Sequence, residues 1–376
     1  MARLAEYVKN NGLFSSCQIE ELIANRTIRG NTPIEKNQLQ PASLDLRLGA
    51  TAYRVRASFL PGQGALVKDK INNLCLHEMH LTNGAVLEVG CVYIIPIMEF
   101  FELPSEIAAS ANPKSSTGRL NVFTRLIADN CRAFDILPAG YHGHVYLEVS
   151  PRSFPILLYQ GSRLNQIRFH QGNYQLTDKE LISIHKKNRI VDTEYAWFNK
   201  GIHISVDLSG TWSDIYHDAL VGYRAKRYTH LIDIDKVNTL SIPDFWDPIK
   251  LGADANTLTL DPGEFYILAS IEGVRIPPTC AAELIPFDQH MGEFRVHYAG
   301  FFDPGFGYTK TGQCITGARA VLEVSSREVP FILEHRQTIG RLVFNRLQKT
   351  PHYLYGGEIG SSYQCQGLKL SKHFRS

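Results

Sequence analysis

The sequence lacks most of the features that identify the common classes of secreted, membrane or metal-binding protein. Its seven cysteines are an odd number, and the closest pair, Cys75 and Cys91, lies 16 positions apart. This spacing excludes a C-x-x-C zinc or redox motif and a dense disulfide framework. No apolar run approaches the length of a membrane-spanning helix, and the N-terminus has no apolar signal core. We therefore expect a cytoplasmic protein with reduced thiols and no membrane partner.

An excess of charge of either sign is also missing. The 39 Lys and Arg residues nearly balance the 37 Asp and Glu residues, which leaves a net charge of +2. Such a balance provides no overall attraction to nucleic acid or to lipid surfaces, so we predict no nucleic-acid partner. Hydrophobic residues at 44% and charged residues at 20% are typical of globular proteins. A length of 376 residues is enough for two domains.

Several catalytic signatures are absent as well. The zinc deaminase pattern, H-x-E followed by P-C-x-x-C, does not occur. The run His77-Glu78-Met79-His80 is not H-E-x-x-H, so it lacks the i, i+4 helical geometry that binds zinc. There is no G-x-x-x-x-G-K-[ST] phosphate loop and no credible Ser-His-Asp set. These absences argue against zinc-dependent and P-loop chemistry.

Short apolar segments separated by Gly and Pro dominate the pattern that is present. Residues 13–28 read as a helix capped by Ser15 or Ser16, because Ile19 and its neighbours repeat at helical spacing. Strand-like segments lie at 41–49, 86–95, 142–149, 154–159 and 163–169. Many short strands with a few short helices predict a mainly β fold, either a β-barrel or a jelly roll.

The chain contains an internal repeat. The segment Y-L-E-V-S at 146–150 returns as V-L-E-V-S at 321–325, an offset of 175, and Tyr93 returns as Tyr266, an offset of 173. A slowly drifting offset over about 120 residues indicates a tandem duplication with small insertions. Each copy is long enough to form its own barrel.

The duplication divides the chain into domains. We predict a first barrel at 1–175, a linker at 176–200 and a second barrel at 201–376. The linker is highly charged, and a short helix is the alternative for part of it.

The two copies differ where chemistry would lie. Copy one has Ser115-Ser116-Thr117-Gly118-Arg119, which can offer backbone N–H groups, two hydroxyls and a guanidinium to one anion. An ordinary serine-rich surface turn is the alternative. Copy two has no such segment, but it carries A-G-F-F-D-P-G-F-G at 299–307 and a Gly- and Gln-rich tail at 355–367. The copies therefore hold complementary halves of what we predict to be one site.

The order of these motifs resembles the dCTP deaminase branch of the trimeric dUTPase superfamily, in its long, tandem-duplicated bacterial form. The motifs are A-S-L-D-L-R-L-G at 42–49, S-S-x-x-R-L at 115–120, the 299–307 hairpin, V-L-E-V-S-S at 321–326 and Y-Q-x-Q-G at 363–367. The resemblance implies two distorted jelly-roll barrels and hydrolysis of dCTP to dUTP and ammonia. It also implies a triphosphate bound with Mg²⁺, no catalytic zinc, and association into a homo-oligomer.

The resemblance also assigns roles to residues. Catalysis falls to Glu323, Ser115 and Arg119. Substrate binding falls to Lys114, Ser116, Ala299, Phe302, Asp303, Tyr355, Tyr363 and Gln366. Three positions depart from the family pattern: Lys114 replaces an arginine, Ser362 replaces a basic tail residue, and Phe301 replaces a polar or basic hairpin residue.

Deamination of cytosine requires water to add at ring carbon 4, a proton to reach ring nitrogen 3, and ammonia to leave. A carboxylate can transfer these protons. Glu323 lies between Leu322 and Val324 on a predicted strand, so it should point away from the face that they occupy. A solvated strand glutamate is the alternative. Glu148 has the same local sequence and is either a structural relic or a second candidate base.

Other residues also have two interpretations. Asp303 could bind the 3′-hydroxyl of the sugar, with Phe302 packed on the sugar face, or could simply form a turn. Arg119 could hold Glu323 or a phosphate, or could form a surface ion pair. The tail that contains Tyr355, Tyr363 and Gln366 could close over substrate or be a polar end of the chain.

Three functions agree with these residues. We predict a dCTP deaminase acting on a free nucleotide. The alternatives are a dUTP pyrophosphatase or a bifunctional enzyme that makes dUMP, and a non-catalytic nucleotide-binding module.

Overall fold

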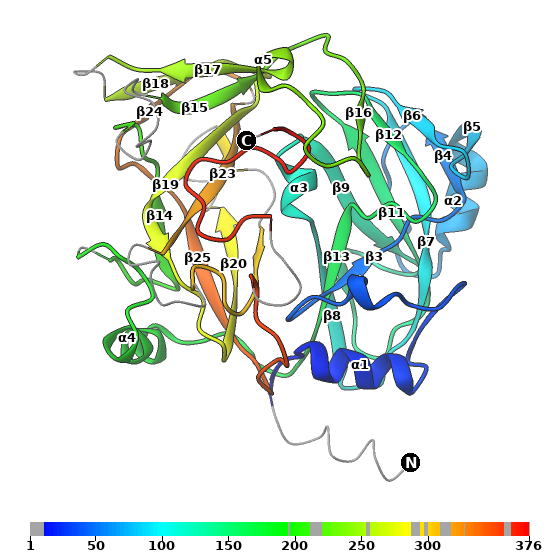
Figure 1. Ribbon diagram of the computed structural model, residues 1–376. Helices are drawn as coiled ribbons and strands as arrows, with labels where there is room; N and C mark the ends of the chain where they lie inside the picture. The colour runs from blue at the N-terminus through cyan, green and yellow to red at the C-terminus, as the bar shows by residue number, and fades with distance from the viewer. Residues whose placement is uncertain are drawn as a thin grey trace. The chain divides into compact units, whose positions relative to one another are not determined.

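The computed structural model describes residues 11–194, 196–210, 220–252, 256–286, 294–296, 300–308, 317–326, 328–356 and 362–375. These residues form two compact units. Unit 1 is built from the first 174 residues together with His230–Val237 and Arg346–His352. Unit 2 is built from Gln175–Thr229, Asn238–Asn345 and the chain from Tyr353 onward. The mainly β architecture that the strand pattern predicted is confirmed (Figure 1).

Unit 1 contains three sheets. Their strand orders are β1-β13-β8-β10 with β3 added on β13, β5-β4-β7-β11-β9 with β2 added on β7, and β16-β12-β6. The elements are β1 (Gly12–Leu13), α1 (Ser16–Ala24), β2 (Ile28–Gly30), η2 (Lys36–Gln38), β3 (Leu44–Leu46), β4 (Thr51–Val55), α2 (Val67–Leu74), β5 (Cys75–His80), β6 (Ala85–Leu87), β7 (Val92–Glu102), β8 (Ile107–Pro113), α3 (Ser115–Gly118), β9 (Val122–Ala128), β10 (Ile136–Leu137), β11 (His142–Pro151), β12 (Ile156–Leu158), β13 (Asn165–Gln171) and β16 (Ile232–Asp233).

Unit 2 repeats this plan. Its sheets run β14-β25-β20-β22, β17-β15-β19-β23-β21 and β18-β24. The elements are α4 (Asp178–Lys187), β14 (Ile202–Ser205), β15 (Leu220–Ala225), α5 (Ile242–Phe245), β17 (Trp246–Lys250), β18 (Thr257–Leu260), β19 (Tyr266–Val274), β20 (Cys280–Pro286), β21 (Phe294–Val296), β22 (Phe301–Phe302), β23 (Ala318–Ser326), β24 (Phe331–Glu334) and β25 (Thr338–Arg346).

The two copies share strand register as well as strand order. Glu148 on β11 lies opposite Ile94 on β7, and Glu323 on β23 lies opposite Ile267 on β19. A one-residue slip would move every side chain of a strand to the other face, so equal register means equal use of both faces. The internal duplication predicted from the repeat is confirmed.

A buried tyrosine makes the same contact in each copy. The hydroxyl of Tyr93 accepts the backbone N–H of Glu88 at 3.1 Å, and that of Tyr266 accepts the N–H of Asp261 at 2.9 Å. Burial raises the pKa of both phenols, so both remain neutral near neutral pH. The tyrosine therefore fixes the same turn before β7 and before β19.

The first helix is shorter than the apolar spacing at 13–28 predicts. Ser15 caps it, and the Ser15 N–H donates to Gln18 Oε1 at 3.1 Å. Ile19 and Leu22 are buried on its inner face. The helix ends at Ala24 because Arg26 has a φ of +61°, which reverses the chain into β2.

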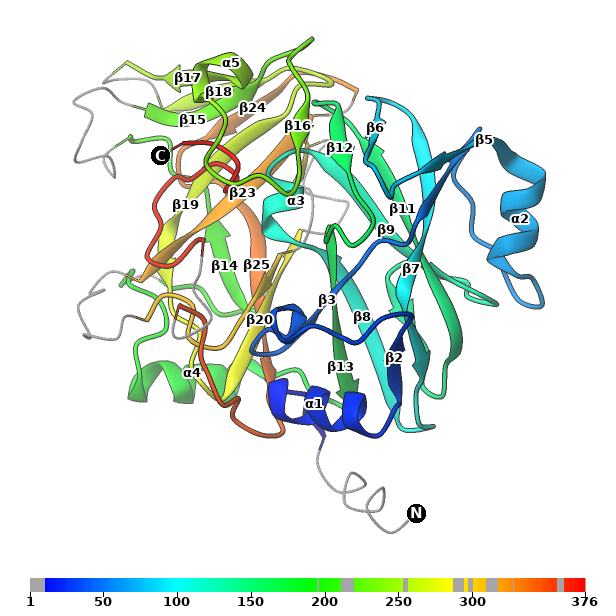
Figure 2. The same cartoon turned by 45° about the vertical axis from the view of Figure 1, so that its right-hand side comes forward.

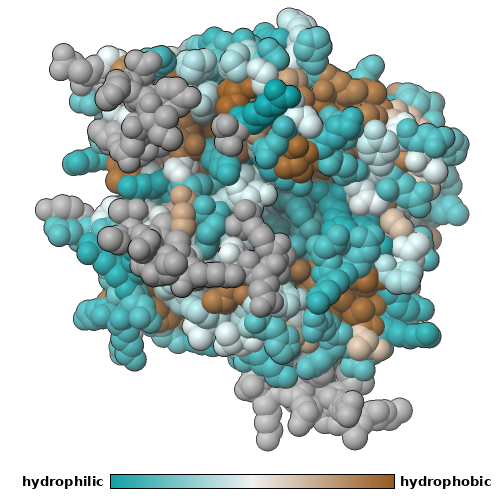
Figure 3. Space-filling view, in the orientation of Figure 1, coloured by the Kyte–Doolittle hydropathy of each residue, from teal (hydrophilic) through white to brown (hydrophobic). Residues whose placement is uncertain are grey.

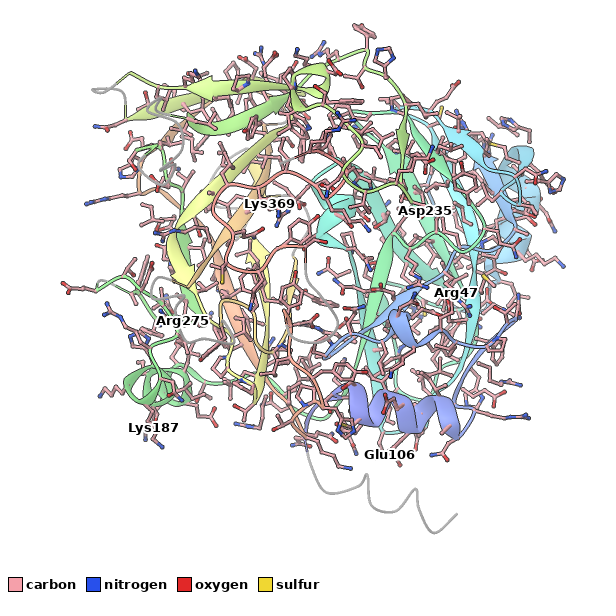
Figure 4. All side chains as sticks on the ribbon, in the orientation of Figure 1. Arg47, Glu106, Lys187, Asp235, Arg275 and Lys369 are labelled. Carbon is pink, nitrogen blue, oxygen red and sulfur yellow. The ribbon has the colours of Figure 1, made fainter. Side chains whose placement is uncertain are left out.

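Residues 230–237 belong to the second half of the sequence, but in the structure they complete a sheet of unit 1. We call them the crossing segment. Its strand β16 pairs in parallel with β12 through Ile232 and Ile156. Asp235, labelled in Figure 4, accepts a hydrogen bond from Ser162 Oγ at 2.8 Å. The crossing segment is seen beside β12 in both Figure 1 and Figure 2.

The region predicted as a linker packs within unit 2. It contains α4, which begins with Thr177 accepting the N–H of Glu180 at 3.4 Å. Ile190 and Val191 are fully buried in the core of unit 2.

No helix in the described part of the chain is both long enough and apolar enough to cross a membrane. On the face in Figure 3, hydrophobic residues form small groups among hydrophilic ones.

Candidate active site

The serine-rich segment of copy one forms a single helical turn, α3, anchored to the core of unit 1. The Lys114 N–H donates to the Leu164 carbonyl at 2.9 Å, and Thr117 Oγ1 donates to the same carbonyl at 2.8 Å. Ser116 and Arg119 are buried, and Ser115 is half-buried. This burial argues against an ordinary surface turn.

The charge of Lys114 is matched within unit 1. Its ammonium group forms an ion pair with the carboxylate of Asp45, which is buried on β3. Asp45 belongs to the A-S-L-D-L-R-L-G motif, so this ion pair joins that motif to the residue that precedes S-S-x-x-R-L. A basic residue held this way can orient the start of α3, while its charge is balanced by Asp45.

Glu148 is fully engaged in its own copy. Its Oε1 accepts Arg125 Nη2 at 2.8 Å and Arg125 Nε at 3.2 Å, and its Oε2 accepts the hydroxyl of Ser58. The Arg125 guanidinium carbon lies 3.6 Å from the ring centroid of Phe134. Both oxygens of this carboxylate are therefore committed to neighbours, as expected for a structural ion pair.

Glu323 occupies the equivalent position on β23 and points as predicted. Leu322 and Val324 are fully buried in the core of unit 2, and Glu323 lies on the opposite face of the strand. It is nevertheless only 7% exposed. The interpretation as a solvated strand glutamate is therefore wrong, and the carboxylate is sheltered outside the barrel core.

The hairpin of copy two begins with β22 and turns at Asp303. Phe302 packs edge-on against Phe306, with ring centroids 5.1 Å apart, and the Phe306 N–H donates to the Asp303 carbonyl at 3.1 Å. Asp303 is buried, although its backbone does form a turn. Gly307 has a φ of +78°, and a Cβ there would meet the Val274 carbonyl at 2.1 Å, so no larger residue fits.

The tail packs on the hairpin and on β23. The Tyr355 N–H donates to the Pro304 carbonyl at 2.8 Å, and the buried Tyr363 hydroxyl accepts the Lys372 N–H at 3.1 Å. Gln366 makes a two-way contact with the backbone of Arg319. The side-chain Nε2 of Gln366 donates to the Arg319 carbonyl at 3.0 Å, and the backbone carbonyl of Gln366 accepts the Arg319 N–H at 2.9 Å. Lys369, labelled in Figure 4, lies on this tail.

The tail is also anchored beyond these contacts. Phe374 packs edge-on against Phe245 and Trp246, with ring centroids 5.5 and 6.0 Å apart. Backbone bonds join Asn238 to the Lys372 carbonyl and Thr239 to the His373 carbonyl, each at 3.0 Å. The described part of the tail, 362–375, is therefore a packed element and not a loose end.

The structure thus gathers the sequence-predicted residues into two sets. Unit 1 places Lys114, Ser115, Ser116 and Arg119 on one helical turn, with Glu148 on β11. Unit 2 places Phe302, Asp303, Tyr355, Tyr363 and Gln366 on the hairpin and the packed tail, with Glu323 on β23 of another sheet. Ala299 lies outside the described residues.

Sequence reasoning missed two residues that support these sets. Asp192 forms an ion pair with Arg319 at 3.2 Å and accepts the Gly273 N–H at 2.7 Å, which steadies the start of β23. Gln364 contacts the hairpin directly. Its place inside Y-Q-x-Q-G was the only available signal.

Within the described ranges, no group of three or more His, Cys, Asp or Glu side chains is arranged to hold a metal ion. Four cysteines of the described ranges are free thiols: Cys17, Cys75, Cys91 and Cys131.

Known proteins match both halves of the chain. Residues 10–173 match the family described as the 2′-deoxycytidine 5′-triphosphate deaminase (DCD) N-terminal domain, and residues 177–374 match the DCD C-terminal domain. The crystal structure of 2′-deoxycytidine 5′-triphosphate deaminase from Agrobacterium tumefaciens is 51% identical in sequence, with a TM-score of 0.85. That similarity covers 90% of this chain and all of the other.

Curated relatives match less than half of the chain. The "dCTP deaminase, dUMP-forming" of Coprothermobacter proteolyticus is 28% identical over 160 residues, which is 42% of this chain and 81% of the relative. The protein of the same name from Methanoculleus marisnigri is 30% identical over 156 residues, which is 41% of this chain and 78% of the relative. These matches confirm the resemblance that the order of the motifs indicated, and the chain belongs to the dCTP deaminase family.

Proposed function

We propose that the chain catalyses the hydrolytic deamination of dCTP to dUTP and ammonia. The observation that carries the proposal is the position of Glu323. It is a carboxylate sheltered on the non-core face of β23, in a chain whose two halves both match the dCTP deaminase family. Its copy-one counterpart, Glu148, is committed to Arg125 and Ser58, so the chemistry is assigned to copy two.

In this mechanism Glu323 acts as the general base. It takes a proton from the attacking water as the oxygen adds to ring carbon 4 of cytosine. The same carboxyl group delivers this proton to ring nitrogen 3. It then takes a second proton from the hydroxyl now bonded to ring carbon 4 and delivers it to the amine, so that the bond from carbon 4 to the amine breaks, ammonia leaves, and carbon 4 becomes a carbonyl of uracil. One positioned carboxylate can perform all these transfers because the water oxygen and the amine are both bonded to ring carbon 4, next to ring nitrogen 3.

The triphosphate is assigned to copy one. Ser115, Ser116 and Arg119 supply hydroxyl and guanidinium donors, and charge-assisted bonds of this kind are the stronger ones. The nucleotide enters as its Mg²⁺ complex, so the magnesium belongs to the substrate. No zinc takes part in the proposed chemistry at the base.

The sugar and the base are assigned to copy two. Asp303 would bind the 3′-hydroxyl with Phe302 against the sugar face, while Tyr355, Tyr363 and Gln366 close the site through the tail. Ala299 completes the hairpin set. We propose that the active enzyme is a homo-oligomer, because the closed threefold arrangement of the superfamily needs three barrels and one chain supplies two.

A nucleotide panel tests the proposal. Purified protein is given dCTP, dUTP, CTP or dCMP with Mg²⁺, and both ammonia and pyrophosphate are measured. Ammonia from dCTP without pyrophosphate supports the proposed reaction. Tight binding of dCTP with no product would contradict it and would indicate a nucleotide-binding module.

A bifunctional reaction is the second candidate. The names of the relatives from C. proteolyticus and M. marisnigri include "dUMP-forming". Pyrophosphate released together with ammonia from dCTP would favour that reaction, and pyrophosphate from dUTP alone would indicate a dUTP pyrophosphatase. The 51% identical relative is called a dCTP deaminase without that qualification, which favours the simpler reaction here.

A further inference from the structure

One side chain of the tail, that of Gln364, bonds to the backbone of the copy-two hairpin. Its Oε1 accepts the Gly307 N–H at 3.1 Å. Its Nε2 lies within bonding distance of three backbone carbonyls, those of Gly305 at 3.1 Å, Tyr355 at 3.4 Å, and Tyr308. We call this set of bonds the Gln364 clasp.

The orientation of the Gln364 amide follows from its partners. One end of the amide meets an N–H group and the other meets carbonyl oxygens. A flipped amide would place Oε1 against these carbonyls and Nε2 against a donor. Glutamine is therefore specifically suited to this position, because a carboxylate has no N–H to donate and an aliphatic side chain makes none of these bonds.

The backbone around the Gln364 clasp leaves little space for change. Gly356 has a φ of +79°, and a Cβ there would lie 2.8 Å from the Gln364 side-chain amide. Gly305 has a φ of +94°, and a Cβ there would lie 2.7 Å from Leu354 Cβ. Small residues on both sides let the amide reach the hairpin backbone.

The residue after Gln364 turns the tail toward a second element. Cys365 has a φ of +51°, a left-handed conformation that is uncommon outside glycine. Beyond it, Gln366 makes its two-way contact with Arg319 on β23, four positions before Glu323. Two glutamines separated by one residue thus fix the tail to the Asp303 hairpin and to the Glu323 strand.

We infer that Gln364 is a positioning residue that couples docking of the tail to the geometry of the Asp303 hairpin. The inference rests on the proposed function. Within the described residues, the hydrogen bonds of the Gln364 side chain go to backbone groups of Gly305, Gly307, Tyr308 and Tyr355, so it acts on the nucleotide through them. Docking of the tail then sets the sugar-binding hairpin, and the two events are cooperative.

Two variants of Gln364 distinguish loss of the N–H donors of its amide from loss of the whole side chain. Gln364→Glu keeps the length and the acceptor for Gly307 N–H, but it removes the donors and places a charge against carbonyl oxygens. Gln364→Ala removes every bond of the clasp. Gln337→Ala is the matched control, because Gln337 also accepts a backbone N–H through its amide, from Glu334 at 2.9 Å, in an exposed turn of the same unit.

We expect both Gln364 variants to lower kcat/KM for dCTP about tenfold or more, and the control to stay within about twofold of wild type. In an Asp303→Ala background, Gln364→Ala should lower kcat/KM for dCTP little further, because Gln364 acts through the hairpin that carries Asp303. If kcat/KM for both Gln364 variants stays within about twofold of wild type, or if the two losses simply multiply, the inference is overturned.

Hydrogen exchange provides a readout that does not depend on turnover. Peptides that cover 303–308 should exchange faster in Gln364→Ala than in wild type or in the control, while peptides from unit 1 should not change. If hydrogen exchange in these peptides is unchanged, the inference about Gln364 is wrong even if activity falls. If wild-type protein releases no ammonia from dCTP, the proposed function fails, and the exchange comparison still decides whether the clasp exists.

Discussion

Glu148 and Glu323 occupy equivalent positions in the two copies, so the same substitution, Glu to Gln, can be made at both. We expect it to affect stability at one position and turnover at the other. Glu148→Gln removes a charge that holds Arg125 through bonds of 2.8 and 3.2 Å, and that also accepts the Ser58 hydroxyl. Glu323→Gln removes the proposed base. The first change should therefore lower stability and the second should lower turnover.

The size of the first effect follows from burial. Removing one partner of a fully buried ion pair costs about 3–5 kcal/mol. The Glu148 side chain is 2% exposed, but the Arg125 side chain is 27% exposed, so water can solvate part of the guanidinium that is left behind. We therefore expect a loss of about 2 kcal/mol in the free energy of unfolding, or about 4–8 °C in Tm for a unit of this size.

The second effect follows from the proposed chemistry. Glutamine has nearly the shape of glutamate but cannot carry a proton, so Glu323→Gln should still bind dCTP. Its kcat should fall by about 100- to 10,000-fold, which is the usual contribution of a general base. Its Tm should remain near that of wild type, since glutamine fills the same space as glutamate on β23.

Both variants are measured for ammonia release, dCTP binding and thermal unfolding. The expected pattern is crossed: Glu148→Gln is less stable but keeps kcat within about tenfold, and Glu323→Gln is stable but inactive. An inactive Glu148→Gln together with an active Glu323→Gln would refute the assignment of the chemistry to copy two. Retention of activity in both variants would reject a glutamate base altogether.

Further outcomes are expected. Ser115→Ala with Arg119→Ala should weaken binding of dCTP by about 1.5–3 kcal/mol per lost charge-assisted bond, and equal weakening for deoxycytidine would contradict a role at the triphosphate. Purified protein should contain no stoichiometric zinc by elemental analysis, and a chelator should act only by removing Mg²⁺; bound zinc whose removal stops deamination would reject the mechanism. Burial raises the pKa of Glu272 above its ordinary value of 4.5, against the opposing effect of hydrogen bonds from Ser205. The folded state therefore keeps the proton to higher pH than the unfolded state, so this contribution to stability is complete below pH 4.5 and is lost as the pH rises through the folded pKa. Glu272→Gln should flatten the dependence of the unfolding free energy on pH in that window, and an unchanged slope would refute this.

The repeat made much of the fold predictable. Because the side chains of a strand alternate between its faces, an offset of 175 between two glutamates predicts that both occupy the same face of equivalent strands. The register of Glu148 and Glu323 confirms this. The direction of Glu323 was equally predictable from its apolar neighbours.

Other parts of the site could not be predicted, because they depend on contacts between distant residues. Lys114 pairs with Asp45 across 69 positions, and Gln364 bonds to Gly307 across 57. Neither contact leaves a periodic pattern in the sequence. The commitment of Glu148 to Arg125 was hidden for the same reason, since its local sequence matches that of Glu323 almost residue for residue.

The crossing segment has a consequence for how the protein folds during synthesis. Unit 1 needs β16 from residues 230–237, and it also needs 346–352, where the Gln348 N–H donates to the Leu13 carbonyl at 2.9 Å. At about 5–20 residues per second, a ribosome takes roughly 10–35 s to proceed from residue 174 to residue 352. For the first part of that interval, until residues 230–237 have been made, β12 has an uncovered edge, which can pair with other chains. The first barrel is therefore an incomplete product until nearly the whole chain has been made, and the first 174 residues expressed alone should aggregate more readily than the full-length protein.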